Sequence, residues 1–313
     1  MDLELRVVQR RLIADGIVEL GLERSGGGAL PGWAPGAHID LELGDLVRQY
    51  SLTGFGDTES RWTVSILLEP DSRGGSEYAH AAIAEGDTVR VSLPRNHFAL
   101  GMDAPSVQFV AGGIGITPLL PMITELEKAG TPWRLFYCGR SRTSMAYLDE
   151  LAAFGDRVRI RPDDEFGLPD LGALLAGTAA DTVVYSCGPE GLLSALEGHC
   201  ADPAHPRALR LERFAPKVVE RDEPDGEFEV EFATSGITVT VAADRSILEV
   251  AEEAGIDLLS SCAEGTCGTC ETPVLAGVVD HRDSVLSDEE RESDTTIMPC
   301  VSRALCARLV LDA

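Results

Sequence analysis

The sequence predicts a chain of three successive domains: an antiparallel β-barrel, a parallel α/β sheet and a small α+β domain. Three observations predict this. Short segments of alternating polarity fill residues 1–100, strands alternate with helices between residues 104 and 215, and a polar, proline-containing segment precedes the remainder. With 313 residues, the chain is long enough for two or three domains of ordinary size.

The first predicted domain, residues 1–103, contains short strands separated by turn residues. One helix is predicted among them, beginning near Ser76 in the segment SEYAHAAIAEG. Regular spacing of short strands favours an antiparallel barrel. The predicted strands are Leu3–Val8, Gly16–Leu22, His38–Leu43, Val47–Thr53, Arg61–Leu68 and Asp87–Leu93.

The second predicted domain, residues 104–215, alternates strands with helices. Helices are expected from the Gly-rich segment after residue 111 to about Lys128, over Met145–Phe154, and after Gly188-Pro189. This alternation predicts a parallel sheet of the nucleotide-binding type. The predicted strands are Val107–Val110, Arg134–Cys138, Thr182–Ser186 and Leu209–Leu211.

A polar segment with two prolines lies at the next boundary, and residues 216–226 are predicted to be a linker. The third domain, residues 227–313, opens with two alternating strands and a helix, continues into a loop rich in cysteine and glycine, and closes with a strand. These elements are predicted at Glu227–Phe232, Thr238–Ala242, Ser246–Ala254 and Arg308–Leu311.

Charge and hydropathy exclude several classes of function. The formal net charge is −26, and residues 216–313 hold 22 acidic against 7 basic residues, or −15 of that total. Nucleic-acid binding needs a basic face and is not expected. The acidity of the third domain has two interpretations, solubility alone or docking on a basic patch of a protein partner.

No run of about 18 apolar residues and no secretion signal is found, so we expect a cytoplasmic protein that does not cross a membrane. Eight cysteines in such a chain favour metal ligation or buried thiols over disulfides.

The cysteines of the third domain form the most specific motif in the chain. Cys262, Cys267 and Cys270 have the spacing C-x4-C-x2-C, and Cys300 follows after 29 intervening residues. This is the spacing of plant-type [2Fe–2S] ligation, in which four thiolates hold two irons. A structural zinc site is the alternative, but it usually pairs two C-x2-4-C segments and no second pair exists. The motif therefore predicts a [2Fe–2S] cluster, with Gly265 and Gly268 admitting the backbone close to it.

Taken together, the motifs resemble the phthalate dioxygenase reductase family, which includes vanillate demethylase reductases. The resemblance covers essentially the whole chain. The matching segments, besides the cysteine loop, are Arg48-Gln49-Tyr50-Ser51-Leu52, Arg73-Gly74-Gly75-Ser76, Gly112-Gly113-Ile114-Gly115-Ile116-Thr117-Pro118, Cys187-Gly188-Pro189 and Glu212-Arg213-Phe214. It implies a flavin-binding antiparallel β-barrel, a ferredoxin-reductase-type nucleotide-binding sheet and a C-terminal β-grasp plant-type ferredoxin domain.

For the first domain, the resemblance implies FMN rather than FAD. It implies a flavin site in which Arg48 reaches the phosphate, Tyr50 lies against the ring or ribityl chain, and Ser51 offers its hydroxyl near flavin N5, with Gln49 in the same segment. Free N–H groups at a helix start also suit a phosphate, so Gly74, Gly75 and Ser76 are expected to form its cradle. Phe214 resembles the family aromatic that covers the flavin and moves aside for hydride transfer; an ordinary core phenylalanine is the alternative.

For the second domain, the resemblance implies a nicotinamide site. Its predicted contacts are Gly113, Ile114 and Thr117 in the first loop and Cys187, Gly188 and Pro189 in the second, because both loops join a strand end to a helix start. Arg140, Ser141 and Arg142 follow the next strand, at the position of the adenine ribose. The family generally uses NADH, whereas two arginines and a serine could hold the 2′-phosphate of NADPH.

The implied activity is that of a monomeric NAD(P)H-dependent oxidoreductase. Hydride passes from the nicotinamide to FMN, and single electrons then pass through the [2Fe–2S] cluster to a Rieske-type oxygenase or O-demethylase docked on the acidic ferredoxin domain. A cytochrome P450 is an alternative acceptor. A non-catalytic iron–sulfur carrier or redox sensor is an alternative of another class, and a flavohaemoglobin-like or nitrate-reductase-like flavoprotein would lack the cysteine loop.

Overall fold

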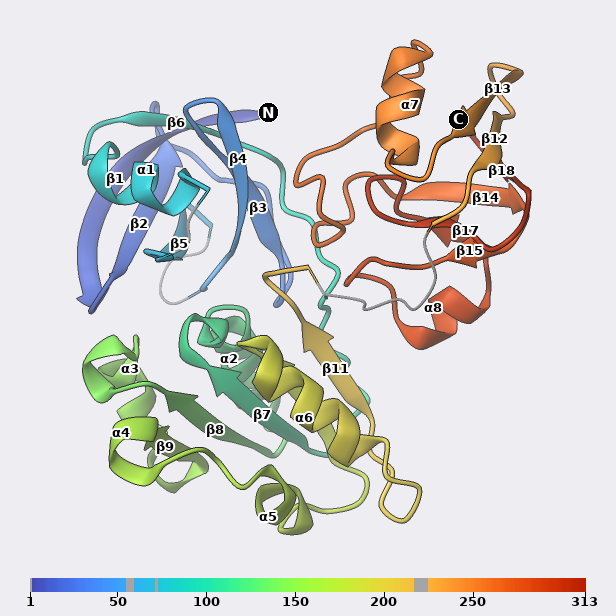
Figure 1. Ribbon diagram of the computed structural model, residues 1–313. Coiled ribbons are helices and arrows are strands. Elements are labelled where there is room, and N and C mark those ends of the chain that lie inside the picture. The colour runs from blue at the N-terminus through green and yellow to red at the C-terminus, as the bar shows by residue number, and fades with distance from the viewer. Residues whose placement is uncertain (1, 55–58, 71–72, 217–224) are drawn as a thin grey trace. The chain divides into compact units, whose positions relative to one another are not determined.

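The computed structural model describes residues 2–54, 59–70, 73–216 and 225–313 (Figure 1). The chain divides into two compact units, with the boundary between Glu212 and Arg213. The predicted linker, residues 216–226, lies largely outside the described residues. No helix in the described part of the chain is long and apolar enough to span a membrane.

The first unit opens with the predicted antiparallel barrel. Its six strands pair in the order β4-β3-β6-β1-β2-β5, and a bridge between Leu52 and Val64 joins the two edge strands. Inward-facing side chains such as Leu20, Ile39 and Trp62 are buried and form its core. The elements are β1 (Leu3–Ala14), β2 (Ile17–Arg24), β3 (His38–Leu43), β4 (Leu46–Ser51), β5 (Arg61–Leu67), α1 (Gly75–Ala81) and β6 (Thr88–Val91).

The same unit continues into the predicted parallel sheet, whose strand order is β11-β10-β7-β8-β9. The chain starts this sheet at β7, extends it to β9, and then returns to add β10 on the other side of β7. The strands are β7 (Val107–Gly112), β8 (Trp133–Gly139), β9 (Val158–Pro162), β10 (Val183–Cys187) and β11 (Leu209–Glu212).

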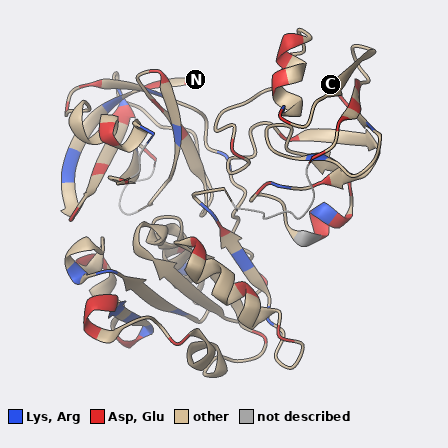
Figure 2. Ribbon diagram, in the orientation of Figure 1, with Lys and Arg blue, Asp and Glu red and all other residues tan. Residues whose placement is uncertain are grey.

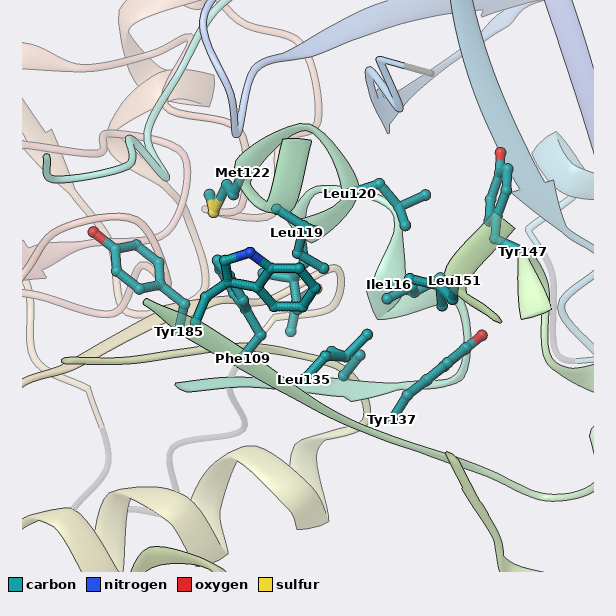
Figure 3. Close-up of a cluster of buried hydrophobic side chains, with 14 of the residues drawn as sticks. Phe109, Ile116, Leu119, Leu120, Met122, Leu135, Tyr137, Tyr147, Leu151 and Tyr185 are labelled. Carbon is teal, nitrogen blue, oxygen red and sulfur yellow. The ribbon is translucent and has the colours of Figure 1, made fainter. Parts of the chain in front are cut away.

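Helices connect these strands and cover both faces of the sheet. Figure 3 shows Leu119 and Met122 packed over Phe109 and Leu135. The elements are η1 (Gly113–Ile116), α2 (Leu119–Ala129), η2 (Arg142–Ser144), α3 (Leu148–Ala152), η3 (Gly155–Arg157), α4 (Asp163–Phe166), α5 (Leu171–Ala176) and α6 (Glu190–Cys200).

The second unit has the predicted α+β fold. Its mixed sheet has the order β13-β12-β18-β14-β16, in which β12 and β18 are parallel. Helix α7 begins at a capping box made by Ser246 and Glu249, and it buries Ile247 and Ala251 against the sheet. The elements are β12 (Phe228–Phe232), β13 (Ile237–Val241), α7 (Ile247–Glu253), β14 (Thr272–Ala276), β15 (Val279–Asp280), α8 (Asp288–Glu292), β16 (Thr296–Ile297), β17 (Arg303–Ala304) and β18 (Arg308–Leu311).

The connection after β8 differs from the prediction. The sequence predicts a helix over Met145–Phe154, but α3 spans Leu148–Ala152. Tyr147 has a φ of 63°, in the left-handed region, so a right-handed helix cannot run through it. Met145 and Ala146 are buried in the core instead. Strand β9 was not predicted, because its Val-Arg-Ile-Arg pattern is short and lies at the sheet edge.

Candidate functional site

The two loops predicted to bind the nicotinamide lie in contact. Strands β7 and β10 are parallel neighbours, with Ala111 opposite Cys187. A Cβ atom on Gly115 would lie 2.2 Å from the carbonyl oxygen of Cys187, and one on Gly112 would lie 2.6 Å from Cδ of Pro189. Such contacts are too short for any side chain, so glycine is required at both positions. The loops meet at the carboxyl ends of the strands where the strand order reverses, a position at which open α/β sheets bind ligands.

The remaining residues of the first loop are placed differently. Gly113 has a φ of 54° and open space beside its Cα. Ile114 is partly buried. Thr117 is 2% exposed, and its hydroxyl donates to the carbonyl of Ile114 at 3.0 Å. The predicted hydroxyl contact of Thr117 with a nucleotide therefore stays a prediction, since its proton is already used within the loop.

Three polar side chains converge near this edge: Ser51 at the end of β4, Cys187 at the end of β10 and Glu212 at the end of β11. Cys187 and Glu212 are register neighbours. Burial raises the pKa of Glu212 to about 8, with Ser51 partly offsetting the shift. Burial, reinforced by Glu212, also raises the pKa of the Cys187 thiol. Burial therefore favours the protonated form of the Glu212 carboxyl.

Ser51 and Glu212 carry buried polar atoms that are not satisfied. Within the described residues, Ser51 Oγ and Glu212 Oε2 have no hydrogen-bond partner of ordinary geometry. Native proteins pair most buried polar atoms, so these two fit a site that a polar ligand completes. Sequence reasoning assigned a role to Phe214 and missed Glu212, although both belong to the same Glu212-Arg213-Phe214 segment at the end of a predicted strand.

A second group of predicted residues forms a turn beside the barrel. Gly74 has a φ of 89° and precedes α1. A Cβ atom on Gly75 would lie 2.7 Å from Cγ of Arg48, so the arginine side chain lies directly over this glycine. Arg48 donates to the backbone carbonyls of Val47 and Arg73 and, within the described residues, makes no ion pair with a carboxylate. A positive charge beside a glycine turn fits a phosphate group.

The other residues of these motifs lie around that turn. Ser76 is buried, and its Oγ accepts from the backbone N–H of Glu69 at 3.1 Å. Tyr50 is packed against the barrel core, and burial raises the pKa of its phenol. Gln49 donates to Asp40 at 3.1 Å. Because side chains alternate along β4, Gln49 and Ser51 point to the face opposite that of Arg48 and Tyr50.

The segment after β8 carries Arg140, Ser141 and Arg142. Arg142 makes a two-point ion pair with Glu165, at 2.7 and 3.2 Å. Ser141 caps η2 through a reciprocal pair of hydrogen bonds with Ser144. Arg140 is exposed, and its guanidinium makes no ion pair with any residue that the structure describes.

Phe214 follows β11 by two residues and is 45% exposed. It lies beyond the boundary of the first unit. Its predicted role over the flavin stays a prediction.

The four cysteines of the predicted cluster motif, all in the second unit, gather around one loop. Cys267, Cys270 and Cys300 are buried, and Cys262 is partly exposed. Gly265 has a φ of 68°, and a Cβ atom there would lie 2.5 Å from the side chain of Val301. The backbone carbonyl of Gly265 accepts from Ser284 N–H at 2.8 Å, which fixes the loop.

The sulfurs fall into two pairs. Cys270 and Cys300 have their Sγ atoms 3.3 Å apart. A hydrogen bond from Cys267, helped by the backbone N–H groups of Glu264 and Thr266, lowers the pKa of Cys262 to about 5. The side-chain interaction with Cys300 likewise lowers the pKa of Cys270. Within the described residues no three His, Cys, Asp or Glu side chains form a single-ion site. Two thiol pairs fit the donor set of a two-iron cluster.

Comparison with known proteins agrees with this geometry. Residues 230–305 match the model of the 2Fe-2S iron-sulfur cluster binding domain. The chain is 45% identical over 304 residues to the phenoxybenzoate dioxygenase subunit beta of Ectopseudomonas oleovorans, covering 96% of this chain and 93% of that protein.

Solved structures that are similar over 99% of this chain include the following two. Phthalate dioxygenase reductase, described as a modular structure for electron transfer from pyridine nucleotides to [2Fe–2S], is 35% identical with a TM-score of 0.70, and 98% of it is covered. An intact type IV self-sufficient cytochrome P450 monooxygenase is 45% identical with a TM-score of 0.92, and this chain spans 41% of its length.

The fold and the two sites define a flavin-, nicotinamide- and [2Fe–2S]-dependent oxidoreductase of the class that serves oxygenase systems. The chain belongs to the phthalate dioxygenase reductase family.

Proposed function

We propose that this chain is an NADH-dependent reductase that binds FMN and delivers single electrons through its [2Fe–2S] domain to a Rieske-type oxygenase or O-demethylase. The observation that carries the proposal is the contact of the Gly112–Gly115 segment with Cys187-Gly188-Pro189, at a sheet edge where Ser51 and Glu212 also meet. When bound, a flavin supplies the step between two-electron hydride chemistry and one-electron transfer.

The residues present fit FMN. Among the residues that the structure describes, the buried atoms Ser51 Oγ and Glu212 Oε2 have no partner of ordinary hydrogen-bond geometry, although Ser51 affects the pKa of Glu212. Arg48 offers a positive charge over Gly75. FMN ends in a single phosphate group, which one glycine turn with one arginine can bind, and this supports FMN over FAD. In this proposal Arg48, Gly74, Gly75 and Ser76 bind the phosphate, Tyr50 lies against the flavin, and Ser51 bonds its ring.

NADH is the proposed nucleotide. Arg142 is engaged by both carboxylate oxygens of Glu165, so the 2′-phosphate of NADPH would have to displace an existing ion pair. Arg140 alone is left for that phosphate, whereas a ribose hydroxyl needs no second cation. This supports NADH over NADPH.

The acceptor has two candidates. The similarity to proteins named as dioxygenase and demethylase components supports a Rieske-type partner. The similarity to a self-sufficient P450 monooxygenase, in which the matching part is 41% of that chain, supports a P450 as the alternative partner.

We propose that the partner docks on the acidic second unit. Exposed carboxylates recur along α7, at Glu249, Glu252 and Glu253 (Figure 2). Reduction of cytochrome c, a basic haem protein, is expected to slow as salt rises, whereas reduction of anionic ferricyanide is expected not to slow. Salt-independent reduction of cytochrome c would contradict docking by charge.

Anaerobic stopped-flow absorbance with NADH and, in parallel, NADPH tests the activity. Flavin bleaching followed by cluster bleaching, faster with NADH, is the expected result, and released flavin identified by mass distinguishes FMN from FAD. Cluster absorbance that neither nucleotide bleaches would replace the reductase with the non-catalytic carrier or sensor.

The proposed domain bounds are 1–103, 104–215 and 227–313. Strand β6 ends at Val91 and β7 begins at Val107, which supports the first boundary. We propose a monomer in the cytoplasm, where a reducing environment keeps the eight cysteines as thiols or ligands. Light scattering of the purified protein tests the monomer.

A further inference from the structure

A tyrosine of the parallel-sheet part enters a buried polar site on the barrel. Tyr147 is 4% exposed, and its hydroxyl lies 2.5 Å from Ser65 Oγ and 3.0 Å from Glu19 Oε2. Glu19 belongs to β2 and Ser65 to β5, and both are buried. Figure 3 shows the Tyr147 ring at the edge of the hydrophobic cluster, with its hydroxyl directed away from Leu151 and toward the blue barrel strands.

The hydrogen-bond directions at this site are determined. Glu19 accepts from Arg11 at 2.6 Å and from Gln9 at 3.3 Å. The Tyr147 hydroxyl has one proton, which it donates to Glu19. The Ser65 hydroxyl must therefore donate to Tyr147. Burial raises the pKa of Tyr147, which keeps this proton in place.

The backbone at Tyr147 is held in an unfavourable conformation. A φ of 63° is uncommon for an aromatic residue, and such conformations persist where the surroundings over-determine them. A second contact lies beside it, because Asp15 N–H donates to the carbonyl of Thr143 at 2.7 Å. The segment from Thr143 to Tyr147 is thus fixed to the barrel at both ends.

The contacts of Tyr147 with Glu19 and Ser65, and of Thr143 with Asp15, connect the two halves of the proposed site. On the sheet side, Tyr147 lies in the connection that begins with Arg140 and Arg142, where the adenine ribose is predicted. On the barrel side, the Tyr147 hydroxyl also interacts with Thr53, two residues beyond Ser51. One buried hydroxyl therefore bonds the nucleotide-binding segment to β2 and β5 of the barrel and interacts with the segment that directly follows β4.

Resting on the proposed function, we propose that Tyr147 is a positioning residue for hydride transfer: held by Glu19 and Ser65, it fixes the connection between β8 and α3 against the barrel. Its hydroxyl sets how the nucleotide bound at the sheet edge meets the flavin bound by β4. It touches neither cofactor in this proposal and acts through the placement of the two parts.

Tyr147→Phe removes the hydroxyl and keeps the ring. The expected result is a fall of about tenfold in the limiting rate of NADH-driven flavin bleaching, because small misplacements of reacting groups are costly. The dissociation constant for NAD+ and the flavin reduction potential are expected to stay close to those of the wild-type protein. A Tyr147→Phe rate equal to the wild-type rate would overturn the proposal.

Tyr185→Phe is the matched control. It removes another buried tyrosine hydroxyl of the same unit, whose partners are the backbone of Ala99 and Gly101. It is expected to lower stability without changing the limiting rate. An equal loss of rate in both variants would show that buried hydroxyls act through general stability, and would overturn the positioning role.

Two further measurements separate this inference from the proposed function. Hydrogen exchange of the Asp15 amide is expected to speed up in Tyr147→Phe and not in Tyr185→Phe. Ser65→Ala, a milder change if Tyr147→Phe folds poorly, is expected to slow hydride transfer, and the double variant is expected to lose less than the product of the single losses. If the wild-type protein is not reduced by NADH, the proposed function fails. If hydrogen exchange of the Asp15 amide is unchanged in Tyr147→Phe, the proposed role of Tyr147 in fixing this segment to the barrel fails as well.

Discussion

The iron–sulfur loop and the flavin–nicotinamide edge are built in opposite ways. Three of the four proposed cysteine ligands lie within nine residues of sequence, and the glycine between the first two lets that short loop fold on itself. The edge instead collects the ends of β4, β7, β10 and β11, which are far apart in the chain. A local motif can therefore define the first site, whereas the second depends on long-range strand order.

This difference predicts that damage to the loop stays local. Cys300→Ser removes one thiolate and is expected to abolish the cluster absorbance and the reduction of cytochrome c. Flavin bleaching by NADH is expected to remain, because the residues proposed to bind both cofactors, apart from Phe214, lie in the other unit. Absorbance and stopped-flow measurements check both results.

Cys306→Ser is the control, since Cys306 lies outside the loop with its Sγ directed at the backbone of Val278 and Arg308. Loss of the cluster in this variant, or its retention in Cys300→Ser, would contradict the assigned ligands.

At the edge, one added methyl group is expected to act across several strands. Gly115→Ala would place its Cβ 2.2 Å from the Cys187 carbonyl oxygen, so β7 and β10 must move apart at the nucleotide loops. We expect NADH-driven flavin bleaching to fall by about a hundredfold, while bleaching by dithionite remains. Stopped-flow comparison of the two reductants measures this.

Gly191→Ala is the matched glycine variant. Gly191 lies in α6 with open space around its Cα, so alanine is expected to fit and to leave the rate unchanged. If the two variants behaved alike, the close contact of the loops would have no bearing on nucleotide use.

Arg48→Ala tests the proposed phosphate contact of the barrel. Arg48 covers Gly75, and a charge-assisted hydrogen bond contributes about 1.5–3 kcal/mol. Flavin binding to the apoprotein, followed by fluorescence, is expected to weaken by one to two orders of magnitude, with the cluster intact. Arg90→Ala, which removes an exposed arginine paired with Glu42, is expected to have no such effect.

The same contrast explains which features the sequence predicts. The order of barrel, parallel sheet and α+β domain is carried by local periodicity, and the fold agrees with it. The cysteine ligands and the two nucleotide loops are each carried by a short motif and stay predictions. Tyr147 shows the limit. Its segment has a helical pattern, but hydrogen bonds to Glu19 and Ser65, distant in sequence, hold it in a left-handed conformation that only the tertiary structure explains.

Glu212 shows the same limit in its charge. A glutamate at a strand end predicts an exposed anion, whereas burial beside Ser51 and Cys187 raises its pKa to about 8. The folded protein then binds a proton that the unfolded chain loses near pH 4.5. Because the folded state binds more protons in this window, stability falls as pH rises from about 4.5 to about 8.

Glu212→Gln removes this titration. The difference in thermal midpoint between the wild-type apoprotein and the variant is expected to shrink or reverse in sign across that pH range. Glu249→Gln is the contrasting control: hydrogen bonds from Ser246 lower the pKa of Glu249, so its contribution is lost only as pH falls below the usual range of a carboxyl. If the difference in thermal midpoint between the wild-type protein and Glu212→Gln did not change with pH, the pKa of Glu212 would not be raised in the folded protein. Glu212 would then behave like an exposed surface carboxylate such as Glu249.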